Sequence, residues 1–189
     1  KIITISNSVK KFFLKDIFKA NSNKFKLIYY GINKSYIRLL ENKKFSYKKL
    51  NLENKLIFGS IGRLVKQKNF HLLIESFSLL IKKYKIDSYL IIAGDGPEKK
   101  SLVEYSRKKQ VYDKIIWTGN IKYVGNFFKK IDIFCMTSKY EGLGLVLLEA
   151  LAYSKPIITP SLSAFPEVIK NNSNGLLVKK YDALNYSKS

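Results

Sequence analysis

This sequence of 189 residues contains little of what holds metal ions, forms disulfides or crosses membranes. Cys135 is its only cysteine, which excludes an internal disulfide and fits a reducing compartment, and its apolar surroundings predict a buried thiol. The single histidine, His71, excludes a His-rich metal site. No stretch approaches the roughly 20 apolar residues of a membrane-spanning helix, and residues 1–11 lack the pattern of a secretory signal. These absences predict a cytoplasmic protein.

Acidic residues are also scarce, since 14 Asp and Glu stand against 35 Lys and Arg and leave a net charge of +21. Such a charge is typical of nucleic-acid-binding proteins. Base readout favours arginine, however, and the only arginines are Arg38, Arg63 and Arg107. The lysines are scattered along the whole chain. We therefore expect no nucleic-acid partner, whereas a diffuse positive field is compatible with peripheral contact with anionic lipid at the inner membrane face.

Short apolar runs alternate with helical patterns from residue 55 onward. Most of the runs are continuous rather than alternating, as in parallel strands that are buried on both faces. They occupy residues 55–62, 88–94, 114–119, 131–138, 156–160 and 175–179. Helices are predicted at residues 70–84, from Pro97 onward and at about residues 143–153. This alternation predicts an α/β fold, a Rossmann-like doubly wound parallel sheet whose ligands bind at the carboxyl ends of the strands.

Residues 1–54 have a different pattern. Residues 6–19 predict a basic helix and residues 27–32 a strand, whereas residues 33–54 are polar and rich in lysine. We expect an edge or connecting region that joins the main unit at about residue 55.

Two loops that follow predicted strands carry residues suited to phosphate. In the first, at residues 62–68, Gly62 allows the backbone to approach a ligand, and Arg63 and Lys68 can meet negative charge at the start of a helix. A basic surface loop in a basic protein is the alternative. In the second, at residues 141–149, glycines precede a helix whose free N–H groups form a natural diphosphate seat. A third loop, at residues 94–98, indicates only a tight turn.

Glu141 and Glu149 flank the second of these loops. If the segment is helical throughout, they lie about 12 Å apart along the axis, which is about the reach of a sugar-diphosphate-ribose. Each carboxylate can accept two hydroxyl hydrogen bonds, which suits a polyol. Glu149 lies in an otherwise apolar helix, where a buried carboxylate without a partner costs several kcal/mol. The alternative is a charge that reaches the surface.

Several motifs resemble one family in the same order. Residues 141–158, EGLGLVLLEALAYSKPII, resemble the E-x7-E segment of the retaining glycosyltransferases of family 4, which have the GT-B fold. Residues 62–77, 93–98, 115–120 and 165–178 resemble further landmarks of the C-terminal, donor-binding domain of that family. The resemblance covers about residues 55–180. It implies that residues 1–32 are a remnant of the N-terminal domain, residues 33–54 the linker and residues 55–189 the nucleotide-sugar-binding Rossmann-like domain.

The resemblance also implies roles for individual residues. Arg63 and Lys68 would bind the donor diphosphate and stabilise the charge that develops on it as the sugar leaves. Glu141 would bind sugar hydroxyls and Glu149 the ribose, so that Arg63, Lys68 and Glu141 are the expected catalytic residues. Backbone N–H groups at the helix start would hold the phosphates. The full donor-binding set is Gly62, Arg63, Lys68, Glu141, Gly144, Leu145, Val146 and Glu149.

Enzymes of this family transfer a hexosyl group with retention and require no metal or other cofactor. The resemblance implies a nucleotide-sugar donor, most often a UDP-sugar, and a sugar or lipid-linked acceptor in cell-surface polysaccharide or glycolipid synthesis. The acceptor would bind through an N-terminal domain that is mostly absent from this sequence. We therefore expect an inactive fragment, which also lacks the helices that close the C-terminal domain.

Two departures from the family pattern concern small residues. Ser154 stands where the family usually has glycine, and Ser163 and Ala164 stand near a usual Gly-Gly pair. Both departures lie outside the expected diphosphate site. The alternatives to a donor-binding half-enzyme are a non-catalytic nucleotide-sugar-binding remnant or regulatory protein, a nucleic-acid-binding protein, and a nucleotide-binding α/β protein of another kind.

Overall fold

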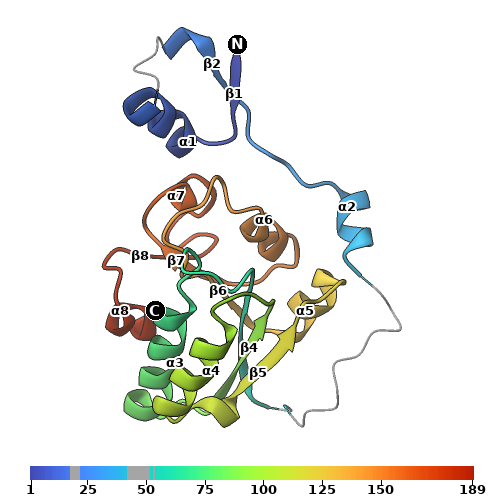
Figure 1. Cartoon of the computed structure of the whole chain (residues 1–189). Coiled ribbons are helices and arrows are strands. Elements are labelled where there is room, and N and C mark those ends of the chain that lie inside the picture. Colours follow the sequence, from blue (N-terminus) through green and yellow to red (C-terminus); the bar gives the residue numbers. More distant parts are fainter. Residues whose placement is uncertain (18–21, 42–51, 53) are drawn as a thin grey trace.

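A computed structural model describes residues 1–17, 22–41, 52 and 54–189 of the chain. Its centre is a parallel sheet of six strands in the order β5-β4-β3-β6-β7-β8 (Figure 1). The strands are β3 (Leu56–Ile61), β4 (Ser88–Ala93), β5 (Ile115–Gly119), β6 (Ile133–Cys135), β7 (Ile157–Pro160) and β8 (Leu176–Val178). Each lies within an apolar run that predicts a strand, so the doubly wound α/β fold is confirmed.

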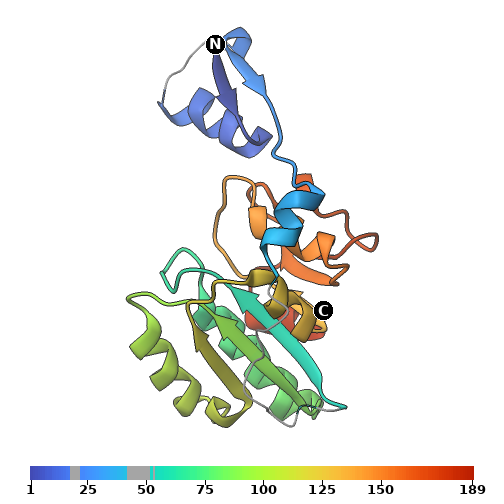
Figure 2. The ribbon, with the colours of Figure 1, turned by 90° about the vertical axis from the view of Figure 1, so that its right-hand side faces the viewer.

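Helices cover both faces of this sheet (Figures 1 and 2). Successive strand residues alternate between two cores, so that Phe58 and Ile158 pack on one face while Ile57 and Ile157 pack on the other. This double burial explains why the strands are apolar at nearly every position. The first face is covered by α3 (Phe70–Tyr84), α4 (Lys99–Lys108) and α8 (Ala183–Lys188), and the second by α5 (Val124–Lys130), α6 (Leu145–Ala152) and α7 (Phe165–Val168).

The details of this domain differ little from expectation. Cys135 is buried, as predicted, and burial raises the pKa of its thiol to about 12. The helix after β4 begins at Lys99 with Glu98 as its N-cap, whereas Pro97 lies in the preceding turn. The helix predicted at residues 143–153 is α6, which is slightly shorter.

The N-terminal residues form a small separate unit (Figures 1 and 2). Two short parallel strands pair with each other, and a helix that continues as a π-helical turn connects them. A single 3-10 turn precedes the second strand. The elements are β1 (Ile2–Thr4), α1 (Asn7–Phe12), the π-helical turn (Phe13–Ile17), the 3-10 turn (Ser22–Lys24) and β2 (Phe25–Leu27).

Sequence patterns describe this unit less well than the main sheet. The helix predicted at residues 6–19 is present as α1 and its π-helical turn, and Ser6 is its N-cap, because the Ser6 hydroxyl accepts a hydrogen bond from the N–H of Val9 at 3.0 Å. The strand predicted at residues 27–32 is wrong, since β2 ends at Leu27. β1 escapes prediction because three residues are too few to show a period.

The expected linker contains a helix, α2 (Lys34–Leu39), that its polar composition does not predict. α2 packs beside α5 and α6 through polar groups near its C-terminal end. The N–H of Gly125 donates to the carbonyl of Leu40 at 2.7 Å, and the Tyr153 hydroxyl donates to the carboxylate of Glu41 at 3.0 Å. Residues 42–51 and 53 of the expected linker, and residues 18 and 19 of the helix predicted at residues 6–19, lie outside the described residues.

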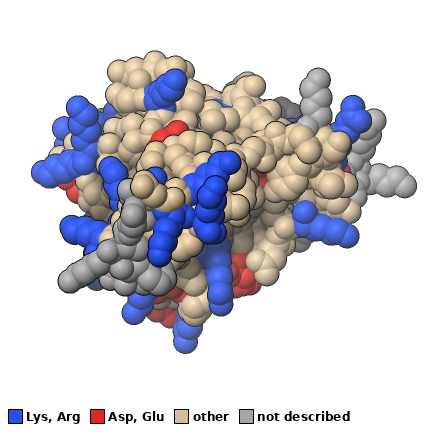
Figure 3. Space-filling view, turned by 90° about the horizontal axis from the view of Figure 1, so that it is seen from above, with Lys and Arg blue, Asp and Glu red and all other residues tan. Residues whose placement is uncertain are grey.

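Lysine and arginine side chains are spread over the face that Figure 3 shows, with few acidic side chains between them. They do not gather into one stripe there. Among the described residues, no helix is both long and apolar enough to cross a bilayer.

Candidate functional site

The carboxyl ends of β3 and β6 lie side by side, because these neighbouring strands are parallel. From β3 the chain moves outward to β4 and β5, and it then returns to form β6 on the other side of β3. Ligands of open α/β sheets bind at such a reversal of strand order. The loops that follow β3 and β6 are the two loops that contain the expected donor-binding residues.

Hydrogen bonds join these two loops. The N–H of Lys139 donates to the carbonyl of Gln67 at 2.8 Å, and the Gln67 side-chain amide donates to the carbonyl of Tyr140 at 2.8 Å. The Thr137 hydroxyl donates to the carbonyl of Lys68 at 3.1 Å. Each loop therefore satisfies polar groups of the other, and the two loops hold one another in place.

Lys68 and Glu141 meet at the junction of the loops. Lys68 Nζ lies 2.5 Å from Glu141 Oε1, and the two side chains are only 21% and 15% exposed. The structure thus brings together two of the three expected catalytic residues as a partly buried ion pair. An ammonium group next to a carboxylate offers one ligand both a cation for phosphate and an acceptor for hydroxyls. The third, Arg63, lies in the first of these loops and is exposed.

Gly62 belongs to a closely packed backbone contact between the loops that follow β3 and β4. The N–H of Gly62 donates to the carbonyl of Ala93 at 3.0 Å. A Cβ on Gly94 would lie 2.0 Å from the Gly62 carbonyl oxygen, and a Cβ on Gly96 would lie 2.5 Å from that of Leu64. The turn at residues 94–98 therefore packs directly against the backbone of the first loop. This close approach explains the glycines of the turn without a chemical role.

The helix start at Gly144 has the geometry of an anion seat. Gly144 is the N-cap of α6 in the left-handed region, with φ 82°, which favours glycine. The N–H of Leu147 donates to the Gly144 carbonyl at 2.8 Å. The N–H groups of Leu145 and Val146 precede that bond, so the helix itself does not use them. They carry the positive end of the helix dipole toward the site.

Glu149 is buried in the same helix, with 8% of its surface exposed, and does not reach the solvent as the alternative interpretation requires. Burial raises the pKa of its carboxyl above the usual value. Its partner is Tyr36 of α2, whose hydroxyl donates to Glu149 Oε1 at 2.6 Å. Sequence reasoning missed Tyr36, which is 113 residues away in a polar segment without a recognisable motif.

Ser154 and Ser163, which lie at or near positions where glycine is expected, both adopt left-handed backbone conformations. Ser154 has φ 52° and Ser163 has φ 54°. Glycine reaches this region without strain, whereas a residue with a Cβ does not. This is a physical reason for glycine at both positions.

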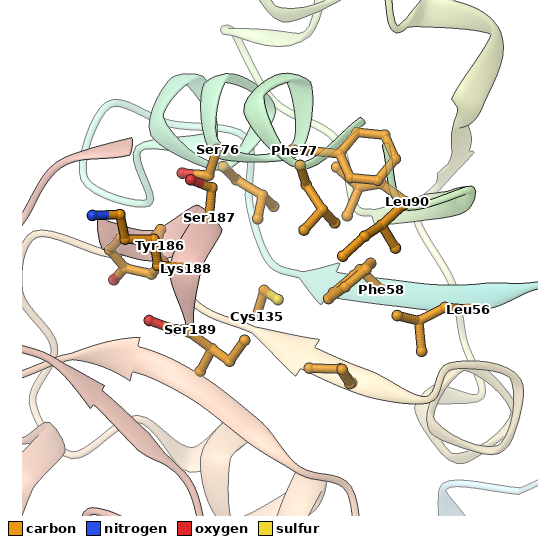
Figure 4. Close-up of a pocket in the computed structure, with 15 residues that line it drawn as sticks. Leu56, Phe58, Ser76, Phe77, Leu90, Cys135, Tyr186, Ser187, Lys188 and Ser189 are labelled. Carbon is orange, nitrogen blue, oxygen red and sulfur yellow. The ribbon is translucent and has the colours of Figure 1, made fainter. Parts of the chain in front are cut away.

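A separate cavity of about 270 Å³ lies between the sheet and helices α3 and α8 (Figure 4). Apolar side chains, including Leu56, Phe58, Phe77 and Leu90, line most of it. It contains none of the expected donor-binding residues. Lys188 is the one cationic side chain among the described residues that line it, so the cavity offers a diphosphate little of the positive charge that it needs.

The family of glycosyl transferases group 1 matches residues 42–189. The chain belongs to this family. It is 33% identical over 149 residues to the O-antigen biosynthesis glycosyltransferase WclY of Escherichia coli, and the aligned region covers 78% of this chain and 40% of WclY. It is 30% identical over 196 residues to the capsular polysaccharide biosynthesis glycosyltransferase CapM of Staphylococcus aureus, with 96% and 48% covered. It thus spans less than half of each relative.

Solved structures show the same fold. The crystal structure of Anabaena HepE in complex with UDP-glucose superposes with a TM-score of 0.84 at 20% identity, over 98% of this chain and 51% of HepE. A glycosyltransferase from Rickettsia africae superposes with a TM-score of 0.81 at 23% identity, over all of this chain and 51% of that protein. The expected family and the GT-B fold, of which this glycosyltransferase chain forms half, are confirmed.

Proposed function

We propose that this chain supplies the donor-binding half of a retaining glycosyltransferase that moves a hexosyl group from a UDP-sugar to a sugar or lipid-linked acceptor. The observation that carries the proposal is the Lys68–Glu141 pair beside the free helix start at Gly144, with Glu149 buried eight residues further on. The names of WclY and CapM, which concern surface polysaccharides, support this class of acceptor. The complex of HepE with UDP-glucose supports the donor.

The phosphate-binding part of the proposed site is cationic. Arg63 and Lys68 neutralise the diphosphate, while the N–H groups of Leu145 and Val146 donate to its oxygens. When the bond between the sugar and the diphosphate breaks, negative charge grows on the departing oxygen. Fixed cations and N–H donors stabilise that charge more than the ground state, and this difference accelerates the reaction without a metal.

The two carboxylates bind the ends of the donor. Glu141 accepts hydrogen bonds from sugar hydroxyls while its other side stays against Lys68, so the sugar and the diphosphate meet at the ion pair. Glu149 accepts hydrogen bonds from the ribose. Because the Tyr36 hydroxyl already donates to Glu149, a ribose hydroxyl joins or replaces this phenol.

The division of the chain follows from this assignment. Residues 1–32 belong to the domain on the acceptor side, residues 33–54 form the linker, and residues 55–189 bind the donor. The acceptor and any peripheral contact with anionic lipid lie on the acceptor side, at the cytoplasmic face of the membrane.

Calorimetric titration of the chain with UDP, GDP and ADP tests the proposal. We expect one nucleotide, UDP, to bind, and Arg63→Ala and Glu149→Gln each to weaken it about tenfold. Lys66→Ala removes an equal charge from an exposed position of the same loop, and Glu104→Gln removes a carboxylate from exposed α4; both should bind UDP as the parent chain does. A folded chain that binds no nucleotide would overturn the donor assignment.

A further inference from the structure

The hydroxyl of Ser163 contacts both backbone polar groups of Glu141. Ser163 Oγ donates to the Glu141 carbonyl at 2.9 Å and accepts from the Glu141 N–H at 3.1 Å. One hydroxyl thus uses its single proton and one of its lone pairs on the same residue. Ser163 lies between β7 and α7, a segment 22 residues away from Glu141 in the chain.

This pair of hydrogen bonds fixes the direction in which the Glu141 side chain leaves the backbone. The N–H belongs to the peptide plane before the Glu141 Cα, and the carbonyl belongs to the plane after it. When both planes are held, φ and ψ of Glu141 are held, and so is the direction of its Cα–Cβ bond. From that direction the carboxylate reaches Lys68 Nζ, 2.5 Å away.

The loop that carries Ser163 is itself held in place by buried neighbours. The next two residues, Ala164 and Phe165, have no exposed surface, so they anchor its loop in the core of the domain. The backbone of Ser163 is held in the left-handed region at φ 54°, where a serine is strained and a glycine is not. The strained residue is therefore the one that supplies the hydroxyl to Glu141.

We propose that Ser163 is a positioning residue, whose hydroxyl holds Glu141 so that its carboxylate stands between Lys68 and the sugar of the donor. This rests on the proposed function, in which Glu141 binds sugar hydroxyls. Ser163 itself acts only through the backbone of Glu141. It follows that Ser163 contributes to recognition of the sugar and not to recognition of UDP.

The first experiment compares the affinities of the chain for UDP-glucose and for UDP in Ser163→Ala and Ser163→Gly. Alanine keeps the backbone strain and glycine relieves it, whereas both lack the hydroxyl. We expect both variants to lose about fivefold to tenfold of the preference for UDP-glucose over UDP, with UDP affinity unchanged. Ser154→Gly is the matched control, because it relieves the same strain at an exposed position beyond the far end of α6.

The second experiment needs no ligand. A double-mutant cycle combines Ser163→Ala with Glu141→Gln and measures the folding equilibrium constant by urea unfolding. Glu141→Gln changes the folding equilibrium constant by a certain factor. We expect this factor to be at least twofold smaller when the Ser163 hydroxyl is absent, because the Lys68–Glu141 pair is then looser.

The outcomes separate the two proposals. If the parent chain binds no nucleotide, the donor assignment fails, and the cycle alone decides whether Ser163 positions Glu141. Additive substitutions in the cycle, or equal losses of UDP and UDP-glucose affinity in both variants, would overturn the positioning role. Losses that follow the stability of the variants, so that glycine and alanine differ, would also overturn it.

Discussion

The six-stranded domain and the N-terminal unit are held together by different forces. In the domain, strands of up to six residues are buried on both faces between two apolar cores. The N-terminal unit has two strands of three residues, and Phe12 is 54% exposed. It is joined to the domain by hydrogen bonds that meet at Glu167 of α7 and by the side chains of Ile5 and Val9, which lie next to Gly142. This carboxylate accepts from the N–H groups of Asn7 and Ser8 at 2.7 and 2.8 Å and from the Tyr29 hydroxyl at 2.9 Å.

One chain thus combines a closely packed domain with a smaller and weaker attachment. The free energy of apolar burial scales with the buried area and does not depend on a single contact. The loops at the sheet edge are therefore supported by a stable core. An attachment that combines a few hydrogen bonds to one carboxylate with a small apolar contact is weaker, and part of it depends on charge.

The largest effect is expected inside the domain. Phe134 has no exposed surface and packs against Phe128 with ring centroids 5.6 Å apart. Phe134→Ala should lower the free energy of unfolding by about 3–5 kcal/mol, because it leaves a cavity in a close-packed core. Phe12→Ala in the N-terminal unit should change it by less than about 0.5 kcal/mol. Urea unfolding of both variants measures the difference, and similar losses would erase the contrast between the regions.

The next effect concerns the attachment at Glu167. Glu167→Gln should loosen α1 by about 1–2 kcal/mol, because Asn7 and Ser8 donate to different carboxylate oxygens and one of these becomes an NH2 group that cannot accept. Hydrogen exchange at Asn7 and Ser8 should become faster, while the unfolding midpoint of the domain stays unchanged. Unchanged exchange at Asn7 and Ser8, or a lower unfolding midpoint of the domain, would show that the carboxylate is not a local attachment.

The same attachment should respond to pH. Burial raises the pKa of Glu167, but the hydrogen bonds from the N–H groups of Asn7 and Ser8, together with those from the side chains of Tyr29 and Asn7, outweigh it and lower the pKa below its usual value. A lowered pKa means that the attachment is complete above the ordinary glutamate pKa and is lost as pH falls through the lowered one. Protection of the α1 amides, measured against their intrinsic exchange rates at each pH, should therefore fall only in acid, and Glu167→Gln should remove this dependence.

A smaller effect is expected where α2 meets the proposed ribose site. Tyr36→Phe removes the hydroxyl that donates to Glu149 and leaves the buried carboxylate without this hydrogen bond. We expect about 1 kcal/mol less stability and UDP affinity that is about threefold to tenfold higher, since a ribose hydroxyl then supplies the missing donor. Tyr30→Phe is the control, because Tyr30 and Tyr36 line one hollow of about 300 Å³, but Tyr30 is 56% exposed. Weaker UDP binding in Tyr36→Phe would mean that the phenol assists the nucleotide.

The smallest effect concerns backbone strain. Ser154→Gly should raise the free energy of unfolding by about 0.5 kcal/mol, because relief of the left-handed strain exceeds the entropy that glycine adds to the unfolded chain. Thermal unfolding measures it. A lower melting temperature would show that the serine side chain compensates for its conformation.

The amino-acid sequence alone determines the six strands, the order of strand and helix, and the two loops that carry Arg63, Lys68, Glu141 and Gly144. Each of these features depends on neighbours within about ten residues, such as a run of buried apolar residues or a glycine before a helix. The sequence also indicates that Glu149 needs a partner, since the rest of its helix is apolar.

Only the tertiary structure decides who the partners are. Tyr36 reaches Glu149 across 113 residues, Ser163 reaches the backbone of Glu141 across 22, and Glu167 receives α1 from 160 residues away. The short strand β1 and the polar helix α2 likewise carry no period that predicts them. The physical reason is that a single hydroxyl or carboxylate looks the same in any sequence, and its role is set by which group the fold places within about 3 Å of it.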